Sequence, residues 1–171
     1  MALHPQNIGA AMPHGFAGSY ARQPDMIVST RPAGGTDQIA FGAALKYDGN
    51  GAVVPMGADD TAELFVGVAA REIKSVLNYL DQGVGTYAPG EAVSVFQRGA
   101  INVKCGNGTP KLGGKVFVRV AENASIPTAV VGGFEAQADG ANAVELTNCQ
   151  WAGPADANGI AELRILTMNN A

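Results

Sequence analysis

Charged, aromatic, cysteine and histidine residues are all scarce in this sequence. Of the 171 residues, 15 % are charged and 6 % aromatic, and there are two cysteines and two histidines. A coiled coil or a long helical protein needs far more Glu, Lys, Leu and Arg. The apolar content of 47 % and the small net charge of −4 exclude a disordered acidic segment. The composition favours a compact fold with one domain, or with one domain and an arm.

Basic clusters and long apolar runs are also missing. The 11 Lys and Arg residues are scattered singly, whereas sequence-independent binding of nucleic acid needs a basic stripe. No stretch approaches the roughly 20 apolar residues of a membrane span, and residues 1–11 lack the pattern of a signal peptide. We therefore expect a protein that is made in a cytoplasm and binds neither nucleic acid nor a membrane.

The side chains that catalysis requires are few. The two histidines, His4 and His14, lie in a proline-containing N-terminal stretch that gives a general base little rigidity. The sequence has no nucleophile elbow, phosphate-binding loop or zinc-binding helix motif. Cys105 and Cys149 lie far apart, and we expect both to be reduced and half-buried. These observations predict a protein that is not an enzyme and holds no metal or cofactor.

Two acidic stretches match cation sites only in part. The loop after Asp48 departs from an EF-hand, because Ala52 and Asp59 occupy positions that need an oxygen ligand and a Glu. We predict a hairpin tip there instead. Asp59, Asp60 and Glu63 are close in sequence, and two interpretations stay open: a cation or shared-proton site, or a solvated loop before a strand.

Glycine and proline, in contrast, are abundant. Together the 23 Gly and 9 Pro make up about 19 % of the chain, against roughly 12 % in average proteins. The glycines follow no three-residue period, which excludes collagen. Most of them separate short apolar or β-branched runs, as expected for turns between strands.

The distribution of these runs predicts an all-β body at 26–171, preceded by an extended N-terminal arm at 1–25. The arm contains three prolines and no sustained periodicity. Strand spacing without a βαβ rhythm indicates one β-sandwich or barrel domain. We expect strands at residues 26–30, 39–46, 52–55, 63–72, 92–105, 115–122, 128–131, 134–138, 143–148 and 160–167. Alternation places Val116 and Val118 on one face of their strand, and Phe117 and Arg119 on the other.

One segment does not follow the β pattern. Ile73, Val76, Leu77 and Leu80 recur at helical spacing. A helix this short is marginal on its own, so a short helix and an extended loop both remain possible at 73–80.

Six residues are candidates for contacts with a partner protein or with other copies of the chain. For Arg98 the alternatives are pairing with a strand neighbour or reaching a partner, and for Trp151 they are closing a core edge or anchoring an interface. The full set is His14, Phe16, Tyr20, Arg22, Arg98 and Trp151.

Four strings of residues, taken in order and spacing, resemble the structural cement proteins of tailed bacteriophages, also called capsid decoration or auxiliary proteins. They are FVGVAAREIK at 65–74, YAPGEAVSVFQRGAINV at 87–103, NGTPKLGGKVFVRV at 107–120 and DANGIAELRIL at 156–166. The resemblance covers most of residues 22–167. Residues before 22 and the segment 75–85 match least.

The resemblance implies a non-enzymatic virion protein with a jelly-roll-like β fold. Proteins of this family bind the outer surface of the capsid between capsomers, stabilise the shell and act as dimers or trimers. The implied partners are the major capsid protein and other copies of the chain. Two alternatives remain: a tail or head–tail connector component, and a carbohydrate-binding β-sandwich.

Overall fold

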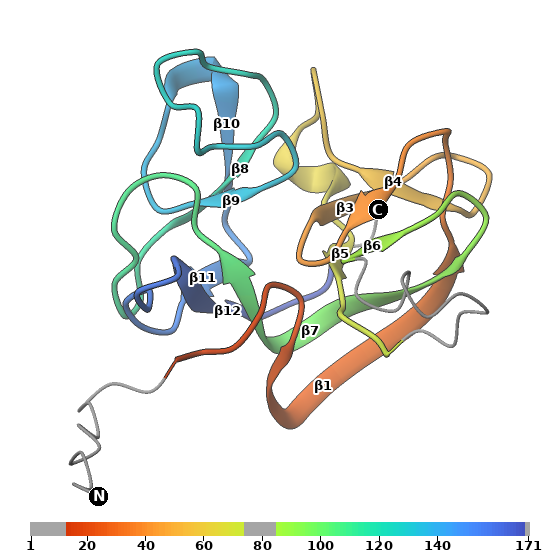
Figure 1. Cartoon of the computed structure of the whole chain (residues 1–171), viewed down its shortest axis with the longest axis horizontal. Coiled ribbons are helices and arrows are strands. Elements are labelled where there is room, and N and C mark those ends of the chain that lie inside the picture. The colour runs from red at the N-terminus through yellow and green to blue at the C-terminus, as the bar shows by residue number, and fades with distance from the viewer. Residues whose placement is uncertain (1–12, 74–84, 170–171) are drawn as a thin grey trace, which may run out of the picture.

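The computed structural model of the chain describes residues 13–73 and 85–169 and is all-β (Figure 1). Its regular elements other than strands are two single turns of 3-10 helix, η1 (Ala62–Leu64) and η3 (Gly140–Asn142). None of the helices in these ranges is long and apolar enough to cross a membrane. The expected all-β class is confirmed.

The larger sheet has seven strands arranged around one long central strand, β7 (Ala92–Lys104). Along the sheet the order is β11 (Cys149–Trp151), β12 (Ile160–Ile165), β7, β5 (Gly67–Ala69), β3 (Ala44–Tyr47) and β4 (Val53–Pro55). The seventh strand, β1 (Tyr20–Pro32), pairs antiparallel with β7. A parallel bridge between Ala33 and Val53 joins the end of β1 to β4.

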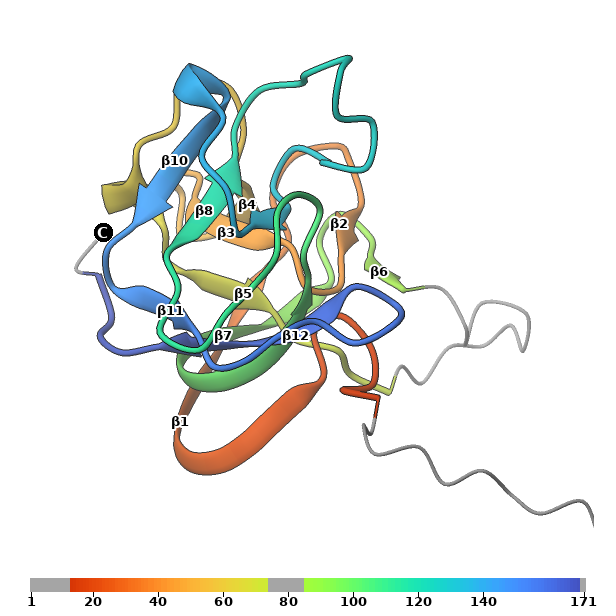
Figure 2. The ribbon, with the colours of Figure 1, turned by 90° about the vertical axis from the view of Figure 1, so that its left-hand side faces the viewer.

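Two smaller sheets complete the fold. One consists of β10 (Ala143–Leu146), β8 (Val116–Arg119) and β9 (Phe134–Glu135), in that order. The other pairs β2 (Ile39–Ala40) with β6 (Thr86–Tyr87). In Figures 1 and 2 the sheet of β8–β10 lies on one side of the molecule. β1 forms the lower border of the molecule.

The main core fills the space between the large sheet and the sheet of β8–β10. Phe96, Ile101 and Leu163 of the large sheet belong to the same buried cluster as Val118 and Phe134 of the smaller one. A second buried cluster, which includes Ile39, Leu45 and Val95, packs on other strands of the large sheet. Burial of such side chains stabilises by roughly 1.5–3 kcal/mol each, so these two clusters hold the layers together.

The hairpin predicted at Asp48 is confirmed. β3 and β4 pair antiparallel across it, and Asp48 Oδ1 accepts hydrogen bonds from the backbone N–H groups of Asn50 and Ala52 at 2.8 and 3.1 Å. Gly49 and Gly51 both have positive φ angles, which glycine adopts without steric cost. The loop is therefore a turn fixed by its own side chain, as the sequence indicated.

Several strand predictions need correction. The strand expected at 128–131 is wrong: these residues form turns, in which the Thr128 hydroxyl donates to the carbonyl of Gly106 at 2.8 Å. The short strands β6 and β11 were not expected. β1 begins at Tyr20, so the last residues of the expected arm pair with β7. Most of the segment 73–80 lies outside the described residues.

Candidate interaction surface

The segment before β1 is fastened to the body by backbone hydrogen bonds. His14 donates its amide N–H to Asp156 Oδ2 at 2.9 Å, and its carbonyl accepts from Asn102 Nδ2 at 2.8 Å. The amide of Gly18 donates to the carbonyl of Asn102 at 2.7 Å. Although burial opposes it, donation from His14 and two other backbone amides lowers the pKa of Asp156. His14 thus serves as an anchor on β7 and on the loop before β12.

Phe16 lies on the surface as part of a stack of aromatic and cationic groups. Its side chain is 64 % exposed, and the Arg71 guanidinium lies 4.6 Å from its ring centroid and 5.6 Å from that of Phe41. Phe41 in turn packs edge-on against Tyr87 at 5.0 Å. Cation–π contacts at exposed sites stabilise by roughly 0.5–1 kcal/mol, so this stack holds an exposed aromatic ring in place.

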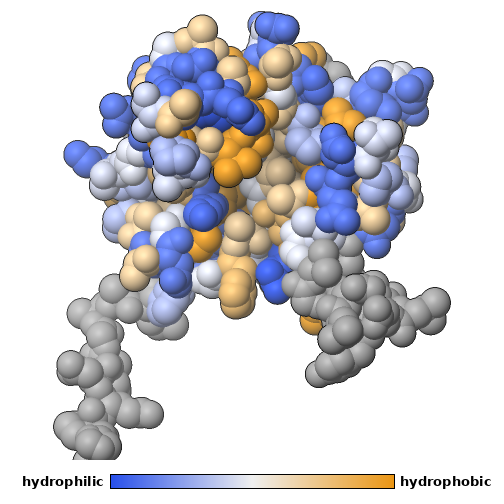
Figure 3. Space-filling view, turned by 45° about the horizontal axis from the view of Figure 1, so that its top comes forward, coloured by the Kyte–Doolittle hydropathy of each residue, from blue (hydrophilic) through white to orange (hydrophobic). Residues whose placement is uncertain are grey.

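An apolar hollow lies beside this stack. It has a volume of about 210 Å³, and Ala17, Phe41, Ala43, Val130 and Val131 are among the residues that line it. Val130 is 68 % exposed. Figure 3 shows apolar side chains gathered between the part of the molecule that carries β8–β10 and the part that carries β3 and β4.

Arg22 and Asp25 line a second groove, and each forms an ion pair there. Arg22 Nε and Nη2 donate to the two oxygens of Glu162 at 2.6 and 3.2 Å, and this pairing raises the pKa of Arg22. Arg98 forms a similar pair with Asp25, with Nη2 2.9 Å from Oδ1. The side chain of Arg98 therefore pairs with a strand neighbour, which is one of the two alternatives left by the sequence.

The same groove, of about 330 Å³, also exposes an apolar side chain and a further arginine. Arg22, Asp25, Leu112, Glu162 and Arg164 are among its lining residues. Leu112 is 82 % exposed. Among the described residues, no ion pair of Arg164 is recorded. We call these five residues the Arg22 groove.

Tyr20 is half-buried against the main core, and Trp151 lies inside it. The Tyr20 hydroxyl donates to Glu72, and its ring packs against Phe96 at 5.8 Å. Burial, followed by the hydrogen bond and the charge of Glu72, raises the pKa of Tyr20. Trp151 is fully buried in the main core, so its environment agrees with the packing alternative. The ring of Phe16, in contrast, lies on the surface.

A cluster of charged residues that sequence analysis missed lies under the β8–β10 sheet. Arg119 is fully buried and donates to both oxygens of Glu135, with Nη2 2.9 Å from Oε2, and to Asp139 Oδ2 at 2.5 Å. Asn123 and Asn142 also donate to Asp139. Their hydrogen bonds, with that of Arg119, lower the pKa of Asp139. Because a buried guanidinium needs such partners, this cluster holds the loops around β8.

The signal for this cluster was present in the alternation of residues 115–122. That pattern places valines on one face of β8, and Phe117 and Arg119 on the opposite face. All four residues of β8 are buried, so the opposite face is covered too. An arginine on a covered face requires carboxylates close by, but the sequence does not say which ones.

The acidic stretch at residues 59–63 does not form a shared site. Asp60 is buried, 2.6 Å from Lys46 Nζ, and accepts from the amide of Gly57 at 2.7 Å. Asp59 and Glu63 are exposed. No group of three or more His, Cys, Asp or Glu among residues 13–73 and 85–169 is arranged to hold a metal ion. The solvated-loop interpretation is therefore wrong for Asp60, which is an internal ion-pair partner.

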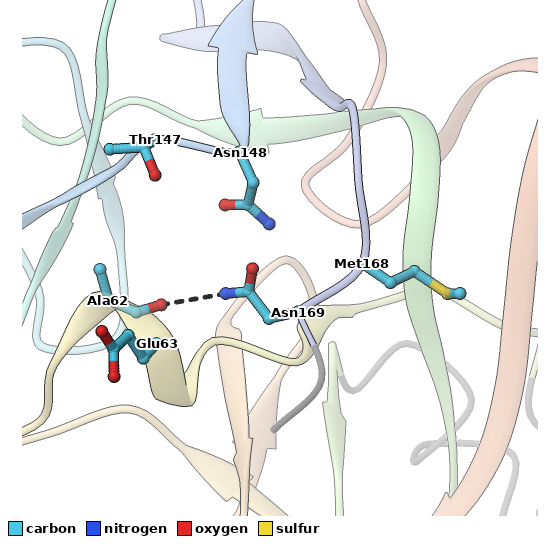
Figure 4. Close-up of a pocket in the computed structure, with 6 residues that line it drawn as sticks. All are labelled: Ala62, Glu63, Thr147, Asn148, Met168 and Asn169. Carbon is cyan, nitrogen blue, oxygen red and sulfur yellow. Dashed lines mark hydrogen bonds between the residues drawn. The ribbon is translucent and has the colours of Figure 1, made fainter.

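Glu63 also lines a cavity of about 340 Å³ at the C-terminal end of the described chain (Figure 4). Asn169 Nδ2 donates to the carbonyl of Ala62 at 3.2 Å, and Asn148 Nδ2 donates to that of Thr167 at 2.8 Å. These two amides tie the C-terminal segment to η1 and to the turn before β11.

Comparisons with known proteins give one family and one fold. The family model described as "Structural cement protein (E217 gp24/Pam3 gp6)" matches residues 4–166. A chain from the solved structure "The capsid of Myoviridae Phage XM1" has a similar fold, with a TM-score of 0.69, 18 % sequence identity and coverage of 99 % of both chains. No curated protein matches the chain.

Proposed function

This chain belongs to the family of phage structural cement proteins, and from that membership we propose that it binds the outer surface of a phage capsid between capsomers and stabilises the shell. Its partners in this proposal are the major capsid protein and other copies of the chain. The observation that carries it is the family match, which extends over residues 4–166 of 171.

The surface of the body supports a role in binding several partners at once. Exposed apolar side chains are spread over different parts of the structure: Phe16 beside Arg71, Val130 at the apolar hollow and Leu112 at the Arg22 groove. Linked contacts of modest strength raise the overall affinity by roughly 10²–10⁴ where the geometry allows simultaneous binding. A protein that lies between capsomers needs this kind of surface.

We further propose that the Arg22 groove contacts the shell. Leu112 offers an apolar group that is 82 % exposed, and it is surrounded by the paired Arg22 and by Arg164. Arginine is enriched among the residues of binding hot spots, which cluster in well-packed pockets. Arg98 supports the groove through its ion pair with Asp25.

The test is addition of the purified protein to preformed shells that lack it. We expect a fixed number of bound copies per shell, measured by particle mass, and a higher melting temperature of the shell. Saturating protein that changes neither quantity would disprove the proposal. Electron microscopy of labelled particles separates it from the connector alternative, because a connector marks one vertex and a cement protein marks the whole head.

Two single substitutions locate the contact. Leu112→Asp is expected to weaken shell binding at least about tenfold, since a hot-spot residue contributes 2 kcal/mol or more. Met168→Asp is the matched control, because Met168 is also an exposed apolar side chain but lines the separate cavity beside η1. Equal binding by the two variants would exclude the Arg22 groove without excluding cement function.

A further inference from the structure

Two turns of this protein share the sequence pattern Asp-x-Asn-Gly. The Asp48 loop (DGNGA, residues 48–52) joins β3 to β4, and the Asp156 loop (DANGI, residues 156–160) leads into β12. In each loop, Oδ1 of the Asp accepts hydrogen bonds from the amides two and four residues later. The distances are 2.8 and 3.1 Å in the Asp48 loop, and 2.8 and 3.0 Å in the Asp156 loop. The two loops are thus a matched pair, each fixed by its own Asp.

The loops differ in the amide that follows the Asn. Gly159, after Asn158, donates its N–H to the carbonyl of Asp156 at 3.0 Å. For Gly51, after Asn50, no such donation is recorded within the described part of the chain. A Cβ added at Gly51 would have no atom within 4 Å, its chain neighbours aside. Both Asn residues are exposed, but of the two glycines it is Gly51 whose backbone nitrogen is free to approach the Asn before it.

This difference matters because an Asn followed by Gly can lose its side-chain amide. The backbone nitrogen of the Gly gives up its proton to base in the solvent and attacks Cγ of the Asn, where glycine has no Cβ to hinder the approach. The bond from Cγ to the amide nitrogen breaks, ammonia leaves and a five-membered succinimide forms. Water then opens this ring at either carbonyl, which yields Asp or isoaspartate. Overall, water replaces ammonia, and nothing is oxidised or reduced.

We propose that Asn50 is a site of spontaneous deamidation in the folded protein, and that the Asp156 loop protects Asn158 from the same reaction. At Asn158, the N–H of Gly159 must first leave the carbonyl of Asp156 before its nitrogen can attack. At Asn50 the attack needs no such step. The Asp carboxylate opposes the negative charge that develops on the attacking nitrogen, but it is present in both loops and so does not distinguish them.

The third Asn–Gly pair, Asn107–Gly108, is held by its surroundings. Asn107 Nδ2 donates to Glu135 Oε2 at 3.2 Å, and the carbonyl of Asn107 accepts from the amide of Ala136 at 2.8 Å. A Cβ added at Gly108 would lie 2.8 Å from that of Gln137, so the backbone is packed against a neighbouring segment. Ring closure would have to disturb these contacts, and we therefore expect this pair to react most slowly.

Deamidation of Asn50 would change both the charge and the length of the hairpin tip. Gly51 lines a hollow together with Arg31, so the added negative charge arises next to a hollow that carries a cation. In the isoaspartate product, the backbone gains a methylene between the amides of Asn50 and Ala52, which both donate to Asp48 Oδ1. The turn then no longer matches its Asp, and we expect the hairpin to loosen.

The test compares the three sites in the folded full-length protein and in the same protein unfolded by denaturant. Mass spectrometry of peptides after timed incubation at mildly alkaline pH measures each rate, because replacement of the amide by a carboxyl group raises the peptide mass. In the unfolded chain the three pairs should react at similar rates. In the folded protein Asn50 should react about two- to tenfold faster than Asn158, the factor that corresponds to one hydrogen bond of about 0.5–1.5 kcal/mol. Equal rates at Asn50 and Asn158 in the folded protein would overturn the proposal.

Two matched variants assign the product to its site. Asn50→Ser and Asn158→Ser each remove one exposed side-chain amide and keep the backbone N–H that donates to the Asp. Since deamidation adds a negative charge, ion-exchange chromatography of the incubated protein separates an acidic form, which we expect to be lost in Asn50→Ser and retained in Asn158→Ser. An acidic form that persists in Asn50→Ser, or that is lost equally in Asn158→Ser, would contradict the assignment. Neither experiment involves shells, so both outcomes are independent of the proposed function.

Discussion

Arg119 and Glu135 form a buried ion pair between the adjacent strands β8 and β9, with both side chains almost fully excluded from water. Asp139, which is partly exposed, provides a second carboxylate for the same guanidinium. Desolvation of charges is costly, and such a pair depends on good geometry and on satisfying the remaining donors. Here hydrogen bonds from Asn107, Asn123 and Asn142 to the two carboxylates complete the arrangement.

Glu135→Gln is expected to destabilise the fold by about 3–5 kcal/mol, because it leaves much of the buried Arg119 charge uncompensated. Denaturant unfolding of the isolated protein measures this change. The double variant Arg119→Met with Glu135→Leu is the control, and it should lose clearly less stability, since it removes both charges. A double variant as unstable as the single one would contradict this account.

Acid is expected to weaken the same region. Because the folded-state pKa of Asp139 is depressed, its contribution is fully present above the ordinary aspartate pKa of about 3.9 and is lost as the pH falls through the lower folded value. Asp139→Asn should remove part of this dependence. Melting temperatures recorded from neutral pH down to about pH 3 measure it. Part of the remaining loss of stability in acid comes from Asp156, whose pKa is also lowered. An unchanged acid profile in Asp139→Asn would be evidence against this role.

Gly18→Ala is expected to be strongly destabilising. At φ of +81°, an added Cβ would lie 2.8–2.9 Å from backbone atoms of Ala69, Arg71 and Gly42. Gly49→Ala is the matched control, because Gly49 has φ of +84° but nothing within 4 Å. Gly49→Ala should lower the free energy of unfolding only by the backbone strain, about 1–2 kcal/mol. Thermal unfolding compares the two variants, and equal losses would show that the close approach at Gly18 is relieved without cost.

The two thiols should differ in reactivity. Cys149 is buried, and burial raises its pKa well above the ordinary value. Cys105 is only partly buried, and its pKa is also raised, mainly by burial. Since the thiolate is the reactive form, we expect slow labelling of Cys105 and labelling of Cys149 only after unfolding. Mass spectrometry after timed exposure to a thiol reagent measures both. Labelling of Cys149 in the folded protein would contradict the burial argument.

The sequence predicted the all-β class and the Asp48 hairpin because both follow from local chemistry. Alternation of apolar residues indicates a strand with one buried face, and Asp and Gly residues indicate a turn. Jelly-roll connectivity, the boundary of the arm at residue 25 and the contact residues stay predictions. Both cysteines are free; Cys105 is half-buried as expected, whereas Cys149 is buried.

The errors, and the alternatives that stayed open, arose where distant parts of the chain decide the structure. At 128–131 a β-branched run reads as a strand, but the Thr128 side chain binds the remote carbonyl of Gly106 and the backbone turns. Trp151 gains its burial from layers contributed by residues far away in sequence. The carboxylates that surround Arg119 come from β9 (Glu135) and from the residue just before η3 (Asp139). A local pattern indicates that such a residue needs partners but does not identify them.

The antiparallel pairing of β1 with β7 has a mechanical consequence. The chain enters β1 at Tyr20, the register shifts between Tyr20 and Val28, and a regular ladder runs from Val28 to Pro32. When a force acts along the strand, the hydrogen bonds of this regular stretch share the load and must lengthen together. Peeling bonds apart one at a time requires a pull across the strands. A pull that enters through residues 13–19 is thus resisted by several hydrogen bonds of this strand at once.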